Sequence, residues 1–206
     1  MKQHRDAATF RVLKRSAEKV HLVSRIRASE AFDERTETGF SALPLLSVTA
    51  DKGVVPRVML DRRDTSSADK AAYKRVVPGD IAYNTMRMWQ GHCGLVLQEG
   101  IVSPAYTVIT PKPGVSSRYC AQLFKLPTMV QIFHRHSQGL VKDTLNLKFE
   151  KFGRIWLALP PYDQQERIAT LLEAMDHQLA LAGDLATALR LQKRGVMQKL
   201  LSGELQ

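Results

Sequence analysis

Three stretches of the chain combine positive charge with side chains that can hydrogen-bond to the edges of nucleic-acid bases. They are residues 51–57, continuing to Arg62, residues 84–91 and residues 134–142. Arginine reads guanine through two hydrogen bonds, Asn and Gln read adenine, and Trp packs on sugars or on a thymine methyl group. The candidate DNA contacts are Lys52, Arg57, Arg62, Asn84, Arg87, Trp89, Gln90, Arg135, Gln138 and Lys142.

These candidates divide by chemistry into base-reading and phosphate-contacting groups. We expect Arg87 and Gln90 to contact base edges. The expected phosphate contacts are Lys52, Arg57 and Lys142. For any single residue, a solvated surface with Trp89 as a core anchor is an equally open interpretation, and the set as a whole favours DNA contact.

Two histidines and one aspartate are the residues that suggest metal chemistry. His134 and His136 are separated by one residue on an expected helix, so their side chains point apart, and no carboxylate or thiol lies nearby in the sequence. A metal-dependent nuclease needs clustered carboxylates, whereas Asp80 stands alone on its strand. We expect Asp80 to cap the Pro78-Gly79 turn, and we expect no metal ion.

The sequence Leu159-Pro160-Pro161-Tyr162 is similar to the Asn/Asp-Pro-Pro-Tyr motif of DNA methyltransferases that modify amino groups. In that motif the polar first residue accepts a hydrogen bond from the target amine, and the aromatic ring stacks on the flipped base. Leu159 cannot accept this hydrogen bond. The sequence also lacks a Gly-rich turn for an adenosyl cofactor, a serine nucleophile elbow and a P-loop. We therefore expect no catalytic residue and no cofactor.

The composition favours a polyanion as the partner. The 206 residues include 30 Lys and Arg against 20 Asp and Glu, and 44% are apolar, which is enough for a folded core. Cys93 and Cys120 are too few for a disulfide framework and are expected to be reduced thiols. No apolar run reaches the roughly 18 residues of a membrane span, and no secretory signal is recognisable, so a cytoplasmic protein without membrane contact is expected.

Charge and turn residues divide the chain into two regions. All nine prolines lie at or before Pro161, and residues 1–162 hold the whole excess of positive charge. Residues 163–206 hold five Lys and Arg against six Asp and Glu. We therefore expect a basic, turn-rich domain over residues 1–160 and a helical region over residues 161–206.

The first region is expected to be a globular mixed α/β (α+β) domain. Apolar and β-branched runs bounded by turn residues predict short strands, with a turn at Asp51–Gly53 and another at Pro78-Gly79. A helix is expected over residues 15–26, and a second over residues 118–136 that Pro127 breaks or kinks. The expected strands are residues 10–13, 43–48, 54–60, 81–83, 94–97, 105–109 and 155–159.

The second region has the pattern of one long helix. Pro160-Pro161 cannot lie inside a helix, and Asp163 and Glu166 can form an Asp version of the capping box. Apolar residues then recur at heptad spacing, with Lys193 as the one polar position. The apolar seam positions, expected to mediate dimerisation, are Ile168, Leu172, Met175, Leu179, Ala182, Ala186, Leu189, Val196 and Leu200.

A helix over residues 164–201 spans roughly 55 Å at about 1.5 Å per residue, which is too long for its seam to be buried on one small domain. The seam therefore predicts a coiled coil with a partner helix. Two copies with antiparallel tails cover each other's seams, which predicts a homodimer. The alternative is a helix that folds back along its own domain.

Both regions resemble the specificity subunits of type I restriction–modification systems. Leu159–Pro161, Gln165-Glu166, Ile168-Ala169 and Met197–Gly203 are similar to the helical region of that family, which usually has Glu-Gln where this chain has Gln-Glu. The segments similar to the family's target recognition domain are residues 44–48, 53–55, 79–84 and 100–106. The resemblance extends from about Phe10 to Gly203.

The resemblance implies a protein that finds a sequence in double-stranded DNA for partner subunits that methylate adenine and cut DNA. Family members usually carry two recognition domains and two helical regions, so this chain is similar to a half-length subunit. The helical region would serve as spacer and as docking site for a methyltransferase subunit, with a restriction subunit as a further partner. Two identical domains related by a two-fold axis then predict a split, palindromic target.

Two other classes of protein remain open from the sequence. One is an autonomous DNA-binding regulator that uses the helix only to dimerise, and co-purification with an adenine methyltransferase separates it from a specificity subunit. The other is a protein that binds a membrane surface through its basic domain. Salt-dependent binding to duplex DNA with a sequence preference separates that class from the first two.

Overall fold

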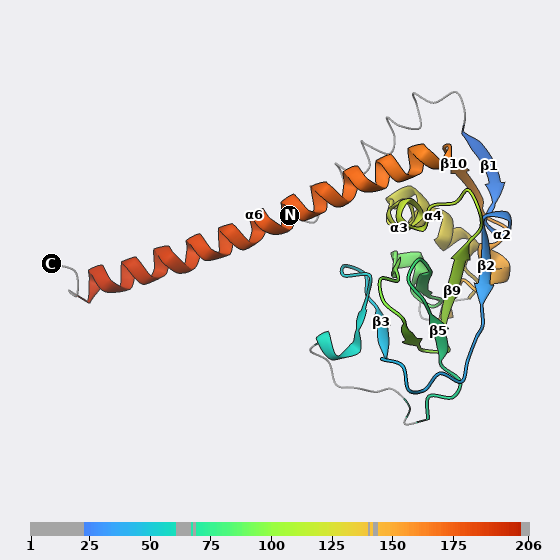
Figure 1. The fold of residues 1–206 in the computed structure, drawn as a ribbon, viewed down its shortest axis with the longest axis horizontal. Coiled ribbons are helices and arrows are strands. Elements are labelled where there is room, and N and C mark those ends of the chain that lie inside the picture. Colours follow the sequence, from blue (N-terminus) through green and yellow to red (C-terminus); the bar gives the residue numbers. More distant parts are fainter. Residues whose placement is uncertain (1–22, 61–66, 68, 140, 142–143, 203–206) are drawn as a thin grey trace. The chain divides into compact units, whose positions relative to one another are not determined.

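The computed structural model describes residues 23–60, 67, 69–139, 141 and 144–202, and its central element is a four-stranded antiparallel sheet (Figure 1). In the order in which they pair, the strands are β2 (Phe32–Arg35), β9 (Tyr106–Pro111), β6 (Ile81–Asn84) and β7 (Cys93–Leu95). Strand β6 pairs with a neighbour on each side, and Ile81 and Tyr83 are completely buried.

Three further pairs of short antiparallel strands complete the β structure. The pairs are β1 (Ser24–Arg27) with β10 (Trp156–Leu159), β3 (Leu46–Val48) with β4 (Val54–Pro56), and β5 (Lys74–Val76) with β8 (Gly100–Val102). Along β10 exposed and buried residues alternate. On its exposed face the guanidinium of Arg27 lies 4.1 Å from the ring centroid of Trp156, a cation–π contact between opposed strands.

Helices account for the remaining regular structure. Ser116 caps α3, because its side chain accepts a hydrogen bond from Tyr119 N. Pro127 lies in the first turn of α4, where its missing N–H costs no intrahelical bond. The helices are α2 (Ala28–Ala31), α3 (Ser117–Leu123), α4 (Pro127–His136), α5 (Phe149–Phe152) and α6 (Tyr162–Leu201), with 3-10 turns η1 (Arg57–Met59) and η2 (Met88–Gln90).

An aromatic cluster joins the central sheet to these helices. Phe32 of β2 and Tyr83 of β6 lie 6.1 and 5.5 Å, between ring centroids, from Phe152 of α5. Phe124, which follows α3, and Phe133 of α4 complete the cluster at 5.5 Å from each other. All five side chains are completely buried, so the apolar area removed from water fixes α3, α4 and α5 against the sheet.

The architecture predicted from the sequence is confirmed, since antiparallel sheets and helices form the body and one long helix follows. The Asp51–Gly53 turn joins the paired strands β3 and β4, and the Pro78-Gly79 turn lies between β5 and β6. Pro127 divides the expected helical stretch into α3 and α4. Each of these features follows from a local turn or helix signal.

Two predictions for single elements are wrong. Residues 24–26, expected at the end of a helix, belong to β1, because Ile26 pairs with Leu157 of β10 and tertiary pairing overrides local propensity. In addition, no strand was expected over Gly100–Val102, where the structure has β8. A Cβ at Gly100 would lie 2.7 Å from Leu46 Cγ, so this glycine permits close packing and does not end a strand. The expected segments 10–13 and 15–22 lie outside the described residues.

The start of α6 also differs from the prediction. The helix begins at Tyr162, so Asp163 lies inside the first turn and Glu166 does not complete a capping box. Glu166 instead accepts a hydrogen bond from Ser116 Oγ. Gln165 is 1% exposed, accepts a hydrogen bond from Ser116 N at 2.9 Å and donates to two backbone carbonyls. The satisfied buried amide anchors the first turn of α6 to the body.

The contacts within the chain define two units, one that ends at Ile168 and one that begins at Ala169. The first unit contains the sheets, helices α2 to α5 and the first turns of α6. The second unit contains the rest of α6, up to Leu201.

Candidate nucleic-acid interface

The turn between β3 and β4 carries the first predicted contact. Thr49 closes the turn, since its N–H donates to Gly53 O at 2.7 Å and its Oγ1 accepts a hydrogen bond from Lys52 N at 3.0 Å. Gly53 has a φ of 69°, a conformation that favours glycine. Lys52 is exposed on this turn, and Arg57 is half-buried at the start of η1. The predicted contact Arg62 lies outside the described residues.

The η2 loop, defined as residues 84–91, carries the second set. Asn84 Oδ1 accepts a hydrogen bond at 3.0 Å from the N–H two residues further on, and half-buried Trp89 donates from Nε1 at 2.9 Å to the carbonyl three residues back. Both side chains therefore stabilise the loop itself. Arg87 and Gln90 are exposed, with Arg87 Nη1 at 3.4 Å from Gln90 Oε1, so their hydrogen-bonding groups are presented together.

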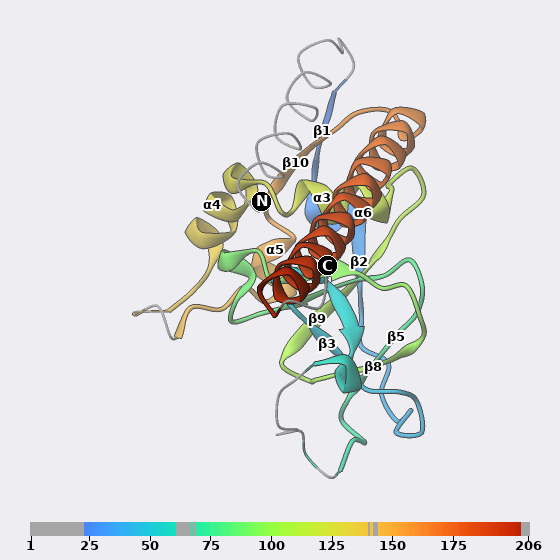
Figure 2. The same ribbon diagram turned by 90° about the vertical axis from the view of Figure 1, so that its left-hand side faces the viewer.

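Helix α4 packs against the η2 loop, and Figure 2 shows the green loop beside the yellow helix. The rings of Trp89 and His134 meet edge to face at a centroid distance of 5.7 Å. Gly91 ends η2 with a φ of 76°, and a Cβ there would lie 3.3 Å from Val130 Cγ2. The helix thus provides a rigid support for the loop.

The third predicted segment follows directly from α4. Arg135 is exposed in the last turn of the helix, and Gln138 is exposed just after it. Gln138 forms an antiparallel bridge with Asn146, and Leu147 N donates a 2.8 Å hydrogen bond to a carbonyl of the η2 loop. These bonds hold the third segment next to the second. The predicted contact Lys142 lies outside the described residues.

The first two segments are also in contact with each other. A Cβ at Gly94 of β7 would lie 2.6 Å from Gly53 Cα, so the β3–β4 turn packs closely on the strand that follows the η2 loop. Lys125 Nζ donates to Ala50 O at 3.0 Å and to Gly91 O at 2.8 Å, which joins the turn to the loop. Lys125 is not among the residues predicted from the sequence, because a single lysine between two helices carries no local signal.

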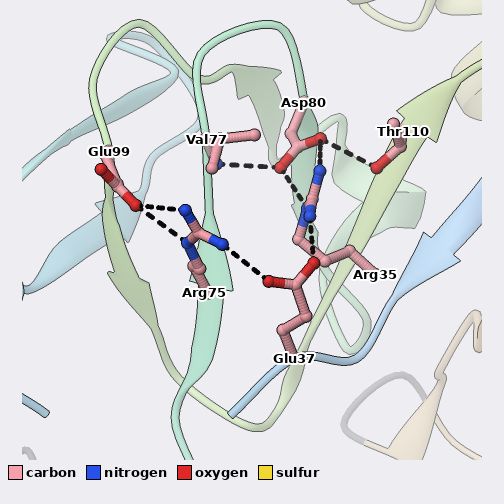
Figure 3. Close-up of polar contacts among 7 residues, drawn as sticks. All are labelled: Arg35, Glu37, Arg75, Val77, Asp80, Glu99 and Thr110. Carbon is pink, nitrogen blue, oxygen red and sulfur yellow. Dashed lines mark hydrogen bonds and ion pairs between the residues drawn. The ribbon is translucent and has the colours of Figure 1, made fainter. Parts of the chain in front are cut away.

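Two arginines of the body, Arg35 and Arg75, form ion pairs with carboxylates (Figure 3). Arg35 Nε donates to Asp80 Oδ2 at 2.8 Å, and Asp80 also accepts hydrogen bonds from Val77 N and Thr110 Oγ1, each at 2.9 Å. Asp80 is 1% exposed, so its carboxylate accepts these bonds away from bulk water. The prediction that Asp80 caps the turn before β6 is confirmed, because Val77 precedes that turn.

Arg75 is the second of these arginines. It donates from Nε to Glu99 Oε1 at 2.8 Å and from Nη1 to Glu37 Oε2 at 2.9 Å, and Glu37 also pairs with Arg35. The hydrogen bond from Arg75 lowers the pKa of Glu37, while the hydrogen bonds to Glu99 and Asp80 raise the pKa of Arg75 and Arg35. The network ties β2 and β5 to the loops that precede β6 and β8 (Figure 3).

Potential metal ligands are dispersed over the part of the chain that the structure describes, where no group of three or more His, Cys, Asp or Glu is arranged to hold an ion. Cys93 and Cys120 are buried free thiols, and burial raises the pKa of both. Within the same described residues, no helix has the length and apolar character needed to span a membrane.

The seam predicted for α6 contains both buried and exposed positions. Ile168 and Leu172 are buried, and Met175 and Ala186 are half-buried. The exposed seam positions are Leu179, Ala182, Leu189, Val196 and Leu200, together with the polar position Lys193. The exposed fraction is 39% at Leu179, 54% at Leu189, 46% at Val196 and 60% at Leu200, so the second unit carries an apolar seam that is open to solvent.

Comparison with known proteins reveals a similarity in fold. The HsdS subunit from Thermoanaerobacter tengcongensis aligns with a TM-score of 0.50 and 14% identity over 87% of this chain and 47% of its own. The S subunit of a type I restriction–modification system from M. genitalium aligns with a TM-score of 0.51 and 9% identity. The alignment covers 92% of this chain and 53% of that subunit. A chain from a structure that describes complex assembly and conformational transition of the type I R-M system aligns with a TM-score of 0.57 and 14% identity. The alignment covers 96% of this chain and 53% of the matched chain.

The chain therefore has the fold of type I specificity subunits, and it spans about half the length of the solved structures that it matches. The resemblance predicted from the sequence is confirmed at the level of the fold. No protein-family model matches this sequence, and no curated protein matches it.

Proposed function

We propose that this chain recognises a DNA sequence for a type I restriction–modification complex. The observation that carries the proposal is that three segments rich in cations and amides are held together on a body with the specificity-subunit fold. The predicted DNA contacts that are exposed in these segments are Lys52, Arg87, Gln90, Arg135 and Gln138. The formal charge of +10 adds a long-range attraction to DNA.

Within this interface the side chains have separate roles. Arg87 and Gln90 read base edges, because a guanidinium and a carboxamide each match the paired hydrogen-bonding groups of one base. Lys52 contacts a phosphate as a point charge on a tight turn. Asn84 and Trp89 hold the η2 loop in the shape that presents the reading residues.

The chain performs no chemistry in this proposal and needs no cofactor. Adenine methylation and DNA cleavage are carried out by a methyltransferase subunit and a restriction subunit, which the chain directs to its target. The fold shared with a structure on complex assembly of the type I R-M system supports this assignment of roles.

The second unit of the chain pairs two copies in the same proposal. The exposed seam residues Leu179, Leu189 and Val196 of one copy pack against those of another in an antiparallel coiled coil. Two identical bodies then read inverted copies of one half-site, so the target is split and palindromic.

Methylome sequencing of cells with and without the gene tests the proposal. Deletion should abolish N6-methyladenine at one split palindromic motif, and the wild-type gene should restore it. Arg87→Ala should restore it only in part and over a motif that is relaxed at one base pair. An unchanged methylome would overturn the proposal. A purified chain that binds a palindrome while the methylome stays unchanged would support the autonomous regulator instead.

A further inference from the structure

Lys125 occupies the short connection between α3 and α4 and reaches two loops that are far apart in the sequence. Its ammonium donates to Ala50 O at 3.0 Å, directly before the β3–β4 turn, and to Gly91 O at 2.8 Å, at the end of the η2 loop. These acceptors are 75 and 34 residues away from Lys125 along the chain. One side chain therefore joins the two loops that carry Lys52, Arg87 and Gln90.

The two hydrogen bonds from Lys125 are stronger than a neutral hydrogen bond on an exposed surface. The bonds are partly buried, and hydrogen bonds from an ionised donor are roughly twice as strong as neutral ones. Moving either loop away breaks one of the two charge-assisted hydrogen bonds that the ammonium donates to the loop backbones. The ammonium therefore resists a displacement of one loop relative to the other.

Packing contacts also hold the two loops in place. The β3–β4 turn meets β7 through the close approach of Gly53 and Gly94, a contact without side chains. The η2 loop rests on α4 through Gly91 and Trp89. Packing contacts of this kind set how close the elements lie, whereas the hydrogen bonds from Lys125 are directional and fix the position of one loop relative to the other.

We propose that Lys125 is a positioning residue for DNA recognition, and this inference rests on the proposed function. It holds the β3–β4 turn and the η2 loop in one register, so that Lys52 meets a phosphate when Arg87 and Gln90 meet their bases. Lys125 itself contacts no DNA. Specificity thus depends on a lysine that donates to the backbone of both reading loops.

The test compares Lys125→Met with Lys74→Met, a matched control. Lys74 is also half-buried and donates to a backbone carbonyl, that of Tyr106, at 2.9 Å, on the central sheet. Hydrogen exchange of the free protein should accelerate at residues 49–53 and 86–91 in Lys125→Met and stay unchanged there in Lys74→Met. Lys125→Arg, which keeps two directed donors, should restore much of the protection.

Binding to cognate and random duplexes across a range of salt concentrations gives the second readout. Lys125→Met should lose about tenfold in affinity for the cognate duplex, with little loss on random DNA and an unchanged salt slope, because no phosphate contact is removed. Equal loss on both duplexes with a slope lower by about one would show a direct phosphate contact and overturn the positioning role.

Failure of the inference can be told apart from failure of the proposed function. Unchanged exchange in both loops of Lys125→Met would overturn the inference whatever the DNA result. A wild-type chain without sequence preference would overturn the proposed function and with it the role of Lys125 in recognition, while the exchange data still decide whether Lys125 couples the loops.

Discussion

Single residues of the η2 loop divide into those that build the loop and those that the loop presents. Asn84 and Trp89 direct their polar atoms to the loop backbone. Arg87 and Gln90 extend into solvent, within 3.4 Å of each other. Because Asn84 and Trp89 hold the loop backbone in one shape, Arg87 and Gln90 have less conformational freedom before binding, and less entropy is lost when they bind a base.

Replacing Arg87 by alanine should weaken binding to the cognate duplex by about 1–3 kcal/mol and relax specificity at one base pair, because a bidentate contact is lost. Lys52→Ala should weaken binding to cognate and random duplexes alike and lower the salt slope by about one. Fluorescence anisotropy with both duplexes at several salt concentrations measures these effects. Equal losses on both duplexes for both variants would contradict the separation of roles.

Residue types predicted which side chains can bind DNA but not where each one points. Asn84 and Arg87 belong to the same sequence pattern, yet Asn84 Oδ1 is used by a backbone N–H and Arg87 is exposed. Glu166 matched a capping box in the sequence and instead accepts a hydrogen bond from Ser116, the residue that caps α3. Lys125 had no signal at all, because its acceptors are carbonyls brought close only by the fold.

At the scale of secondary-structure elements, the carboxylate–arginine network holds the body together where strands are short. Arg35 on β2 and Arg75 on β5 share Glu37, and Glu99 and Asp80 bring in the loops before β8 and β6. Strands of three or four residues make few ladder bonds, so side-chain ties between elements add to their stability.

Replacing Glu37 by glutamine should lower the thermal unfolding midpoint at neutral pH and have little effect in acid. The hydrogen bond from Arg75 lowers the pKa of folded Glu37 below its ordinary value of 4.5. Its stabilisation is therefore present above the unfolded pKa and is lost as the pH falls through the lower folded pKa. Differential scanning calorimetry from pH 7 to well below 4.5 follows this loss.

The control for Glu37→Gln is Glu150→Gln, which removes a carboxylate that pairs with Arg154 in the i,i+4 arrangement. A pair with that spacing ties no separate elements together, so the control should change the midpoint less at neutral pH. If the unfolding midpoint of Glu37→Gln lies below that of wild type by the same amount in acid as at neutral pH, then loss of the ion network is not the cause of the destabilisation.

Elements that are determined by neighbouring residues in the sequence were predicted well, whereas elements that are determined by contacts between distant residues were not. Pro127 ends one helix and begins the next by its own covalent geometry, so the break between α3 and α4 was visible in the sequence. Strand β8 is defined by its pairing with β5, and Gly100 is required there by Leu46, which lies 54 positions earlier. No window of neighbouring residues contains that information.

At the scale of the whole molecule, the second unit is part of one long helix whose apolar seam needs a partner surface. Its seam keeps large apolar side chains exposed, including Leu179, Leu189 and Leu200. Contiguous exposed apolar surface of this kind marks an interaction site in a soluble chain. Leu181 is 55% exposed as well, but it lies off the heptad seam, on the opposite side of the helix.

The seam predicts that the full chain forms a dimer at micromolar concentration. Leu179→Asp places a charge in the seam and should shift the equilibrium to monomer, since burial of an unpaired carboxylate opposes association. Leu181→Asp introduces the same charge at a similarly exposed position off the seam and should leave the dimer intact. Sedimentation equilibrium of the three chains measures their masses. A monomeric wild type, or two variants that dissociate equally, would show that this seam does not pair two copies.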